Sequence, residues 1–430
     1  MNKFILLVLL TAGWFALPAY GQLSIDQCHE KARNNYPQIK QYSLIEQSGN
    51  YSISTANKGY LPQVTLSAQT TYQSDVTEIP PGLSQLLSQM TGQAVAMESI
   101  SNDQYRVVAE VNQTIWDGGM ISSQKENIKA NTALAKQQLE VDLYTINERV
   151  NHLFFGILAL NEQIIQIELL QQELQTNYDK LSTFLENGVA NQTDLDRIRV
   201  EQLKVNQKKA GISATLQSFR EMLAGMTGDV AALTATLEKP VVDTAVGGDI
   251  AIKRLELKLF DAQTNLLASQ EKLIKSQNLP KLGVFGQGGY GNPGLNMLQP
   301  GFTSYYVLGA RLTWNFSGLY SQANKLSKIA VSKQTVASQK ETFLFNTQLK
   351  VTNAHHEIAK LKEQLISDTE IIALRKSIKK SAEVQVENGT RTVTDLIREI
   401  NAERTAIQDK ALREIELTMA VYNLKNITNN

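Results

Sequence analysis

One stretch of the chain places its apolar residues at alternating intervals of four and three positions for more than six heptads. This is the period of a left-handed coiled coil. A second apolar stripe runs beside the first, which predicts that the helix contacts more than one neighbour. The first series is Leu139, Leu143, Ile146, Val150, Leu153, Ile157, Leu160, Ile164, Ile167, Gln171, Leu174, Tyr178, Leu181 and Leu185, with Gln171 its only polar member, and the second is Phe154, Leu158, Ile165 and Leu169.

Helix-breaking residues are almost absent from two long segments. Residues 120–187 contain no proline and a single glycine, Gly156, and residues 320–388 contain neither. A helix of this length measures about 100 Å at a rise of about 1.5 Å per residue. We therefore predict long helices over 120–187 and 320–388.

A return helix is predicted after each long helix. The heptad period resumes over 191–226. In the second half of the chain the period is looser, so the helix over 392–428 is predicted from the absence of breakers and from symmetry. Each long helix and its return helix are expected to pack antiparallel as a hairpin.

Four segments instead alternate apolar and polar residues, as in strands with one apolar and one polar face. Val64 and Leu66, for example, alternate with Thr65 and Ser67. The segments form two predicted β-hairpins, 63–116 and 281–316. Each strand approaches the roughly 9–11 residues of a membrane-spanning strand. Aromatic residues near the strand ends are predicted to form a membrane girdle: Tyr72, Tyr105, Trp116, Tyr290, Tyr305 and Trp314.

The same order of features occurs twice. Leu61-Pro62 precedes the first β-hairpin and Leu279-Pro280 the second, and in each case the proline ends the incoming helix. An Asn-Gly turn ends each long helix. We predict two tandem repeats, 22–240 and 241–430, each with a helix, a β-hairpin, a long helix and a return helix.

The N-terminus has the features of an export signal. Lys3, an apolar run over 4–17 and the small residues Ala19 and Gly21 predict a signal peptide over 1–21. No later run approaches the roughly 20 apolar residues of a membrane helix, so membrane insertion is predicted to use strands. Four strands cannot close a barrel, and lipid does not tolerate open strand edges, so the chain is expected to oligomerise. The single cysteine, Cys28, cannot form an internal disulfide and is expected to be half-buried in a helix.

Composition and motifs exclude several classes of function. Lys and Arg number 42 and so do Asp and Glu, and no helix is dense in basic residues, so no nucleic-acid partner is expected. The sequence has no Ser-His-Asp set, no phosphate-binding glycine loop and no Cys/His cluster with ligand spacing. We therefore expect no catalytic activity, no cofactor and no bound metal.

Taken in order, these features resemble the TolC-like outer-membrane efflux protein family, over nearly the whole mature chain. The most specific part is Gly389-Thr390-Arg391-Thr392 followed by Asp395-Leu396, which resembles the family's periplasmic tip, while 188–195 resembles the tip of the first repeat. The resemblance implies a mainly α protein with a membrane β-barrel portion. It implies a homotrimer in outer-membrane lipid, whose twelve-stranded β-barrel continues as a twelve-helix α-barrel in the periplasm. It also implies a periplasmic adaptor and a proton-driven or ATP-driven inner-membrane pump as partners.

The resemblance also implies a gate at the two tip turns, which contain Gly188 and Gly389. Arg391 would form a closing salt bridge with Asp194, and Asp395 would belong to an acidic ring at the entrance. Arg398 replaces an acidic residue that is often found there in the family, so the entrance is predicted to be less acidic. A second interpretation is local, since an acidic residue near a helix start complements the helix dipole and caps free N–H groups.

Three functions follow as hypotheses. The leading one is a passive exit duct that carries small molecules from the periplasm to the exterior, driven by a partner in the inner membrane. The alternatives are a duct for type I protein secretion, and a non-conducting coiled-coil protein that spans the envelope.

Overall fold

In the computed structural model, residues 22–78, 80–92, 100–188, 191–241, 251–297, 299 and 301–429 are described. The signal peptide predicted over 1–21 lies outside them. The chain divides into two compact units. The first contains the residues up to Lys40 with 139–257 and 341–430, and the second contains 41–138 and 258–340. Each unit therefore contains residues from both predicted repeats.

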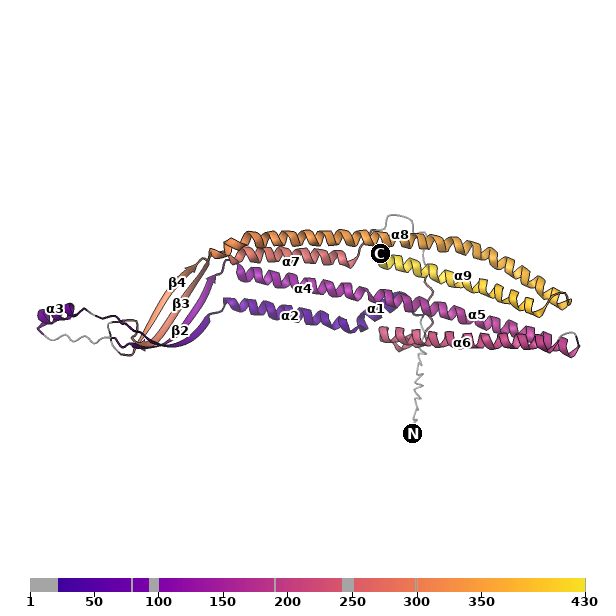
Figure 1. The fold of residues 1–430 in the computed structure, drawn as a ribbon, viewed down its shortest axis with the longest axis horizontal. Coiled ribbons are helices and arrows are strands. Elements are labelled where there is room, and N and C mark those ends of the chain that lie inside the picture. Colours follow the sequence, from indigo (N-terminus) through magenta and orange to yellow (C-terminus); the bar gives the residue numbers. More distant parts are fainter. Residues whose placement is uncertain are drawn as a thin grey trace, which may run out of the picture. The chain divides into compact units, whose positions relative to one another are not determined.

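The structure is mainly helical, and most helices lie where the sequence predicts them (Figure 1). The longest is α8 (Ser317–Glu387), 71 residues without interruption. The return helices are α6 (Gln192–Thr227) and α9 (Val393–Thr428). The predicted helix 120–187 is divided at Thr145 into α4 (Met120–Tyr144) and α5 (Ile146–Glu186). The hydroxyl of Thr145 donates to the carbonyl of Asp142 at 2.8 Å, a local bond that competes with the helical pattern.

In the first unit, α5 packs against both α6 and α9. The heptad series is buried along most of its length, which confirms the seam read from the period. Phe154, from the second stripe, is also fully buried, whereas Ile165 and Leu169 remain exposed in the single chain. Asp368 of α8 forms an ion pair with Arg413 of α9. The short helix α1 (Ile25–Asn35) contains Cys28, which is fully buried rather than half-buried.

Gly156, the one glycine of the first long stretch, makes room for an aromatic ring. A Cβ at this position would lie 2.5 Å from Cε2 of Phe219 on α6. Replacing a helical glycine by alanine ordinarily stabilises by about 0.5–1 kcal/mol, but overpacking costs about 1–3 kcal/mol. Gly156→Ala is therefore expected to lower the free energy of unfolding by about 1 kcal/mol, measured by denaturant titration in detergent.

Gly211 on α6 is the matched control. A Cβ at Gly211 would meet no atom within 4 Å. Gly211→Ala is expected to raise the free energy of unfolding by about 0.5–1 kcal/mol. Equal effects of the two substitutions would contradict the packing argument.

In the second unit, four strands form one antiparallel sheet in the order β1-β2-β3-β4. They are β1 (Gln63–Tyr72), β2 (Asp103–Trp116), β3 (Lys281–Asn292) and β4 (Thr303–Thr313). The two predicted hairpins are thus joined through the pairing of β2 with β3. Strands β1 and β4 are the two edges.

The strand register separates an apolar from a mainly polar face. Leu66 pairs with Ala109, Ala109 with Gly288, and Gly288 with Tyr306, so these four lie on one face. The apolar face includes Val64, Leu66, Ala68, Val107, Ala109, Val111, Leu282, Val284, Tyr306, Leu308 and Leu312. The opposite face includes Thr65, Ser67, Gln69, Arg106, Glu110, Gln287 and Arg311.

The register also tests the predicted aromatic girdle. Tyr72, Tyr105 and Tyr290 lie on the apolar face, and a β-bulge after Thr114 brings Trp116 to the same face. Trp314 follows β4 directly, and its indole N–H donates to the carbonyl of Asn278 at 3.1 Å. Tyr305 does not fit the predicted membrane girdle. It pairs with Gly289 on the polar face, and Tyr306 occupies the apolar face instead.

The helices of the second unit follow the order of the strands (Figure 1). Ion pairs join α2 (Gln41–Asn57) to α4, α4 to α7 (Leu255–Gln277), and α7 to α8. Lys333 of α8 and Lys275 donate to Glu271 of α7, and these bonds lower the pKa of Glu271 to about 2. The helices thus form one layer, with α2 at one edge and α8 at the other.

Two features were not predicted. The segment between β1 and β2 contains a helix, α3 (Pro81–Thr91), which begins at a proline in a favoured first-turn position. Among the described residues, one helical stretch, Met120–Glu186, contains a segment long and apolar enough to cross a membrane by length and composition alone. The sequence-based expectation that no run after the signal peptide approaches the length and apolar composition of a membrane helix was therefore too strict. A helix that packs on several neighbours meets the same test, and α5 does so against α6 and α9.

Candidate functional site

The two turns that end the long helices have the same geometry. Gly188 and Gly389 both adopt left-handed φ angles, 74° and 70°, which glycine accepts without strain. The preceding Asn187 and Asn388 each donate a side-chain N–H to a carbonyl four residues earlier, both at 2.9 Å. The repeated Asn-Gly pairs are therefore the tips of two helical hairpins.

The caps of the return helices lie three residues before the predicted acidic residues. Asn191 and Thr392 are the N-caps, and their side-chain oxygens accept from the backbone N–H of Asp194 and Asp395 at 3.0 and 3.2 Å. The two aspartates occupy the first helical turn, where a negative charge complements the helix dipole. A hydrogen bond from the Thr392 hydroxyl lowers the pKa of the Asp395 carboxyl, with a further contribution from Arg398.

The charged residues of the tips form local ion pairs within the single chain. Asp194 contacts Arg197 at 3.8 Å, and Asp395 contacts Arg398 at 3.4 Å. Arg391 pairs with Glu399 of α9 at 3.1 Å. The expected pair between Arg391 and Asp194 is therefore not formed within the chain, because a nearer carboxylate on its own hairpin holds the guanidinium. Thr390 donates its hydroxyl to the carbonyl of Gln385 and closes the second turn.

A few contacts join the two tips directly. Arg197 donates to the hydroxyl of Thr394 at 2.6 Å, and Lys180 contacts Glu387 at 3.6 Å across an exposed surface. Beneath them lies an apolar cluster contributed by both hairpins, with a void of about 30 Å³ beside it. The buried members of this cluster are Leu181, Leu195, Ile198 and Val393.

Sequence reasoning missed a charged cluster further from the tips. Glu173 of α5 accepts from Lys379 of α8 and from Arg404 of α9, both at 2.7 Å. Lys379 also pairs with Glu403 of α9 at 2.5 Å. We call these four residues the Glu173 node. The only sequence signal was a set of charges beside apolar positions, which does not say which charges meet.

Burial and hydrogen bonding act in opposite directions on the charges of the Glu173 node. Burial disfavours the ammonium of Lys379, but hydrogen bonds to Glu173 and Glu403 outweigh that effect, so its pKa is raised. The side chain of Glu403 is only 5% exposed and that of Glu173 is 12% exposed. The node is a compensated set of two acids and two bases, removed from most of the solvent.

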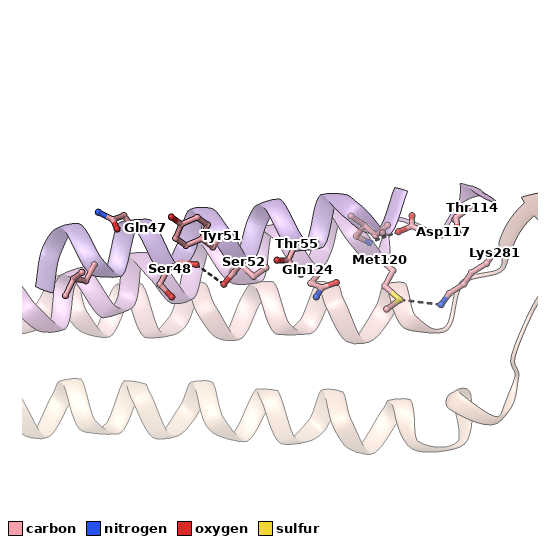
Figure 2. A pocket seen from close by; sticks show the side chains of 15 residues that line it. Gln47, Ser48, Tyr51, Ser52, Thr55, Thr114, Asp117, Met120, Gln124 and Lys281 are labelled. Carbon is pink, nitrogen blue, oxygen red and sulfur yellow. Dashed lines mark hydrogen bonds between the residues drawn. The ribbon is translucent and has the colours of Figure 1, made fainter. Parts of the chain in front are cut away.

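An open cleft lies in the second unit (Figure 2). It has a volume of about 970 Å³ and lies beside α2 and the start of α4. Its charged lining residues already have structural contacts. The carboxylate of Asp117 accepts from the backbone N–H of Ile121 at 2.6 Å, and Lys281 contacts the sulfur of Met120 at 3.4 Å. Leu44 and Tyr51 of α2 line the cleft and are exposed.

A smaller polar pocket of about 260 Å³ lies in the first unit, beside α1, α5 and α9. His29 lies 2.7 Å from the amide oxygen of Asn151, and burial lowers the pKa of its imidazole. In the part of the chain that the structure describes, no three His, Cys, Asp or Glu side chains are arranged to hold a metal ion.

Comparison with known proteins gives one family and a set of similar folds. Residues 29–229 match the family model described as outer membrane efflux protein. No curated protein is significantly similar to the chain. The outer membrane protein VceC of Vibrio cholerae has the same fold, with 13% identity, a TM-score of 0.67, and coverage of 94% of this chain and 96% of that one.

Two further solved structures agree. The CmeC outer membrane channel of Campylobacter jejuni shares 12% identity, with a TM-score of 0.63 and coverage of 94% of this chain and 85% of that one. The MtrE outer membrane channel of Neisseria gonorrhoeae, in its open state, shares 11% identity, with a TM-score of 0.64 and coverage of 94% and 89%. At sequence identities this low, the structural similarity shows that the chain shares the fold of these proteins.

Proposed function

Because the chain belongs, through residues 29–229, to the outer membrane efflux protein family, we propose that it is the exit duct of a tripartite efflux system. The family consists of channels rather than enzymes. Location in the outer membrane with a long periplasmic helical part, as the sequence predicted, is confirmed at the level of the family and fold. In the proposed function, small molecules enter at the helical tips and leave through the strands without energy input from this chain.

The two-faced sheet is the observation that carries the proposal. Its apolar face suits lipid, and its polar face, which includes Arg106, Glu110 and Arg311, suits a water-filled lumen. A sheet of four strands cannot satisfy its own edges in a membrane. We therefore propose that β4 of one copy pairs with β1 of the next.

The proposed assembly is a homotrimer with twelve strands and a helical wall. The helix layer of the second unit ends at α2 and α8, in the same order as the sheet, which supports a head-to-tail contact that closes into a ring. Apolar side chains are exposed along both edge helices, with Leu44 and Tyr51 on α2 and Tyr320 and Val331 on α8. The two tandem repeats, 22–240 and 241–430, remain part of this proposal, supported by the identical geometry of the two tips.

A periplasmic adaptor and an inner-membrane pump are the proposed partners, as the match to the efflux protein family implies. The proposed contact region is the pair of tips. We propose Asp194, Thr390, Arg391, Asp395 and Arg398 as the residues that line and control the entrance. The alternation of acids with Arg197 and Arg398 at both tips supports an entrance with mixed charge.

Conductance in planar bilayers tests both the duct and its gate. A partly exposed ion pair contributes about 1 kcal/mol at most, equivalent to about a fivefold change in the ratio of open to closed channels. Arg391→Ala removes the pair with Glu399 and is expected to raise the open fraction by up to about fivefold. Asp194→Ala is expected to act in the same direction.

Lys360→Ala is the control, because Lys360 pairs with Glu357 on the surface of α8 at 2.6 Å and belongs to neither tip. It is expected to leave conductance unchanged. Unchanged conductance in both tip variants would refute the gate assignment. A wild-type protein without any conductance would favour a structural coiled coil over a duct.

A further inference from the structure

The Glu173 node is the place where buried charges join the two helical hairpins of one chain. Two other partly buried ion pairs near the tips stay within the second hairpin, because Arg375 of α8 and Arg391 of the turn both pair with Glu399 of α9. Glu173, in contrast, extends from the first hairpin to cations on both helices of the second. The contact of Asn401 with Glu201, at 3.2 Å between α9 and α6, crosses the same boundary.

Contacts on the tip side of the node differ in kind. Lys180 and Glu387 lie 3.6 Å apart and are both more than half exposed, and Arg197, which donates to Thr394 of the other hairpin, is 51% exposed, so water can replace both interactions. The apolar cluster around Leu181 and Val393 has no directional bonds, and apolar surfaces can slide and pack again.

Separating the two hairpins at the Glu173 node would have a different consequence. Moving α5 away from α8 and α9 would leave Lys379 with one acid and Arg404 without its acid, in a site largely removed from solvent. A buried charge that loses its partner is strongly unfavourable. The node therefore resists separation of the hairpins far more than the tips do.

We propose that Glu173 is a positioning residue that anchors the two hairpins of each chain, so that they separate only on the tip side of the node. The proposal rests on the proposed function, in which the entrance must open. It makes the Glu173 node the fixed end of the moving segment. Glu173 lies 15 residues before Gly188, and Lys379 lies 10 residues before Gly389, so the moving segment is short.

Two cross-links within one chain test the anchor. All variants carry Cys28→Ser, so that no native thiol remains. The pair Glu201→Cys with Asn401→Cys joins the hairpins near the level of the node, and the pair Lys180→Cys with Glu387→Cys joins them on the tip side. Each pair is linked by a short bis-thiol reagent, and conductance is compared before and after linking.

The node-level link is expected to leave opening unchanged, while the tip-side link is expected to abolish it. Loss of opening with the node-level link, or normal opening with the tip-side link, would overturn the anchor. If the unlinked variants and the wild type do not conduct at all, the proposed function fails, and a second measurement still decides the anchor.

That measurement uses spin labels at the same two pairs of positions in the detergent-solubilised protein. The anchor predicts a narrow distance distribution for 201 with 401 and a broader one for 180 with 387. Glu173→Gln is expected to broaden the node-level distribution. Glu168→Gln, which removes an exposed pair with Lys209 inside the first hairpin, is expected to leave it narrow. Equal distributions in the two variants would refute a positioning role for Glu173.

Discussion

Leu66→Arg is expected to prevent stable insertion of the strands, at a cost of about 2–4 kcal/mol for a cationic side chain on the lipid face. Leu66 lies on the apolar face of β1, opposite Ala109, and is 75% exposed in the single chain. Such exposure of a large apolar side chain in a sheet is unfavourable in water but not in lipid. Insertion is measured as the fraction of protein that folds into lipid vesicles and resists urea extraction, and this fraction is expected to fall.

Ser67→Arg is the control for this prediction. Ser67 is the next residue on the same strand and pairs with Val108 on the opposite face, which the proposed function assigns to the lumen. A water-filled lumen tolerates an added charge, so Ser67→Arg is expected to insert like the wild type. If the two variants inserted equally, the assignment of the faces would be incorrect.

Gly118→Ala is expected to destabilise the junction between β2 and α4 by about 2–4 kcal/mol. Gly118 has a φ of 71°, which costs an L-residue about 1–2 kcal/mol. Its new Cβ would also lie 2.6 Å from Cβ of Leu279 and 3.2 Å from the carbonyl oxygen of Pro280. Neither atom is the free end of a flexible side chain, so the backbone itself would have to shift.

Gly119→Ala separates the backbone strain from the collision. Gly119 has a similar φ of 77°, but no atom lies within 4 Å of the position of its Cβ. It is expected to cost only the backbone term, about 1–2 kcal/mol. Urea denaturation in detergent compares the two, and the collision is refuted if Gly119→Ala costs as much as Gly118→Ala.

Repetition and period were the strongest predictors of the fold. The heptads located the end of α5 and both ends of α6 within one residue, and the alternating segments located the four strands. The break at Thr145 was missed because threonine is an ordinary helix residue and only its bond to Asp142 marks the interruption. Helix α3 was not predicted because its start coincides with Pro80 and Pro81, and adjacent prolines usually mark a turn or loop.

The candidate site, like the fold, could be predicted from the sequence only in part. The Asn-Gly turns and the acidic residues after them could be recognised from their repeated spacing. The partner of each acidic residue could not be recognised, because Arg391 was expected to pair with Asp194 of the other tip but pairs with Glu399 of its own return helix. Arg391 lies in the turn just before the N-cap Thr392, and the fold of this turn brings its guanidinium within 3.1 Å of Glu399 on α9.

By itself, the sequence determined the local elements, because helix period, strand alternation and turn chemistry depend on residues close together in the chain. It also determined that the strands have one lipid-compatible face. Only the tertiary structure decided that β2 pairs with β3 and that Glu173 meets Lys379 and Arg404. These outcomes depend on register and on contacts between residues about 200 positions apart, for which a single sequence carries no local signal.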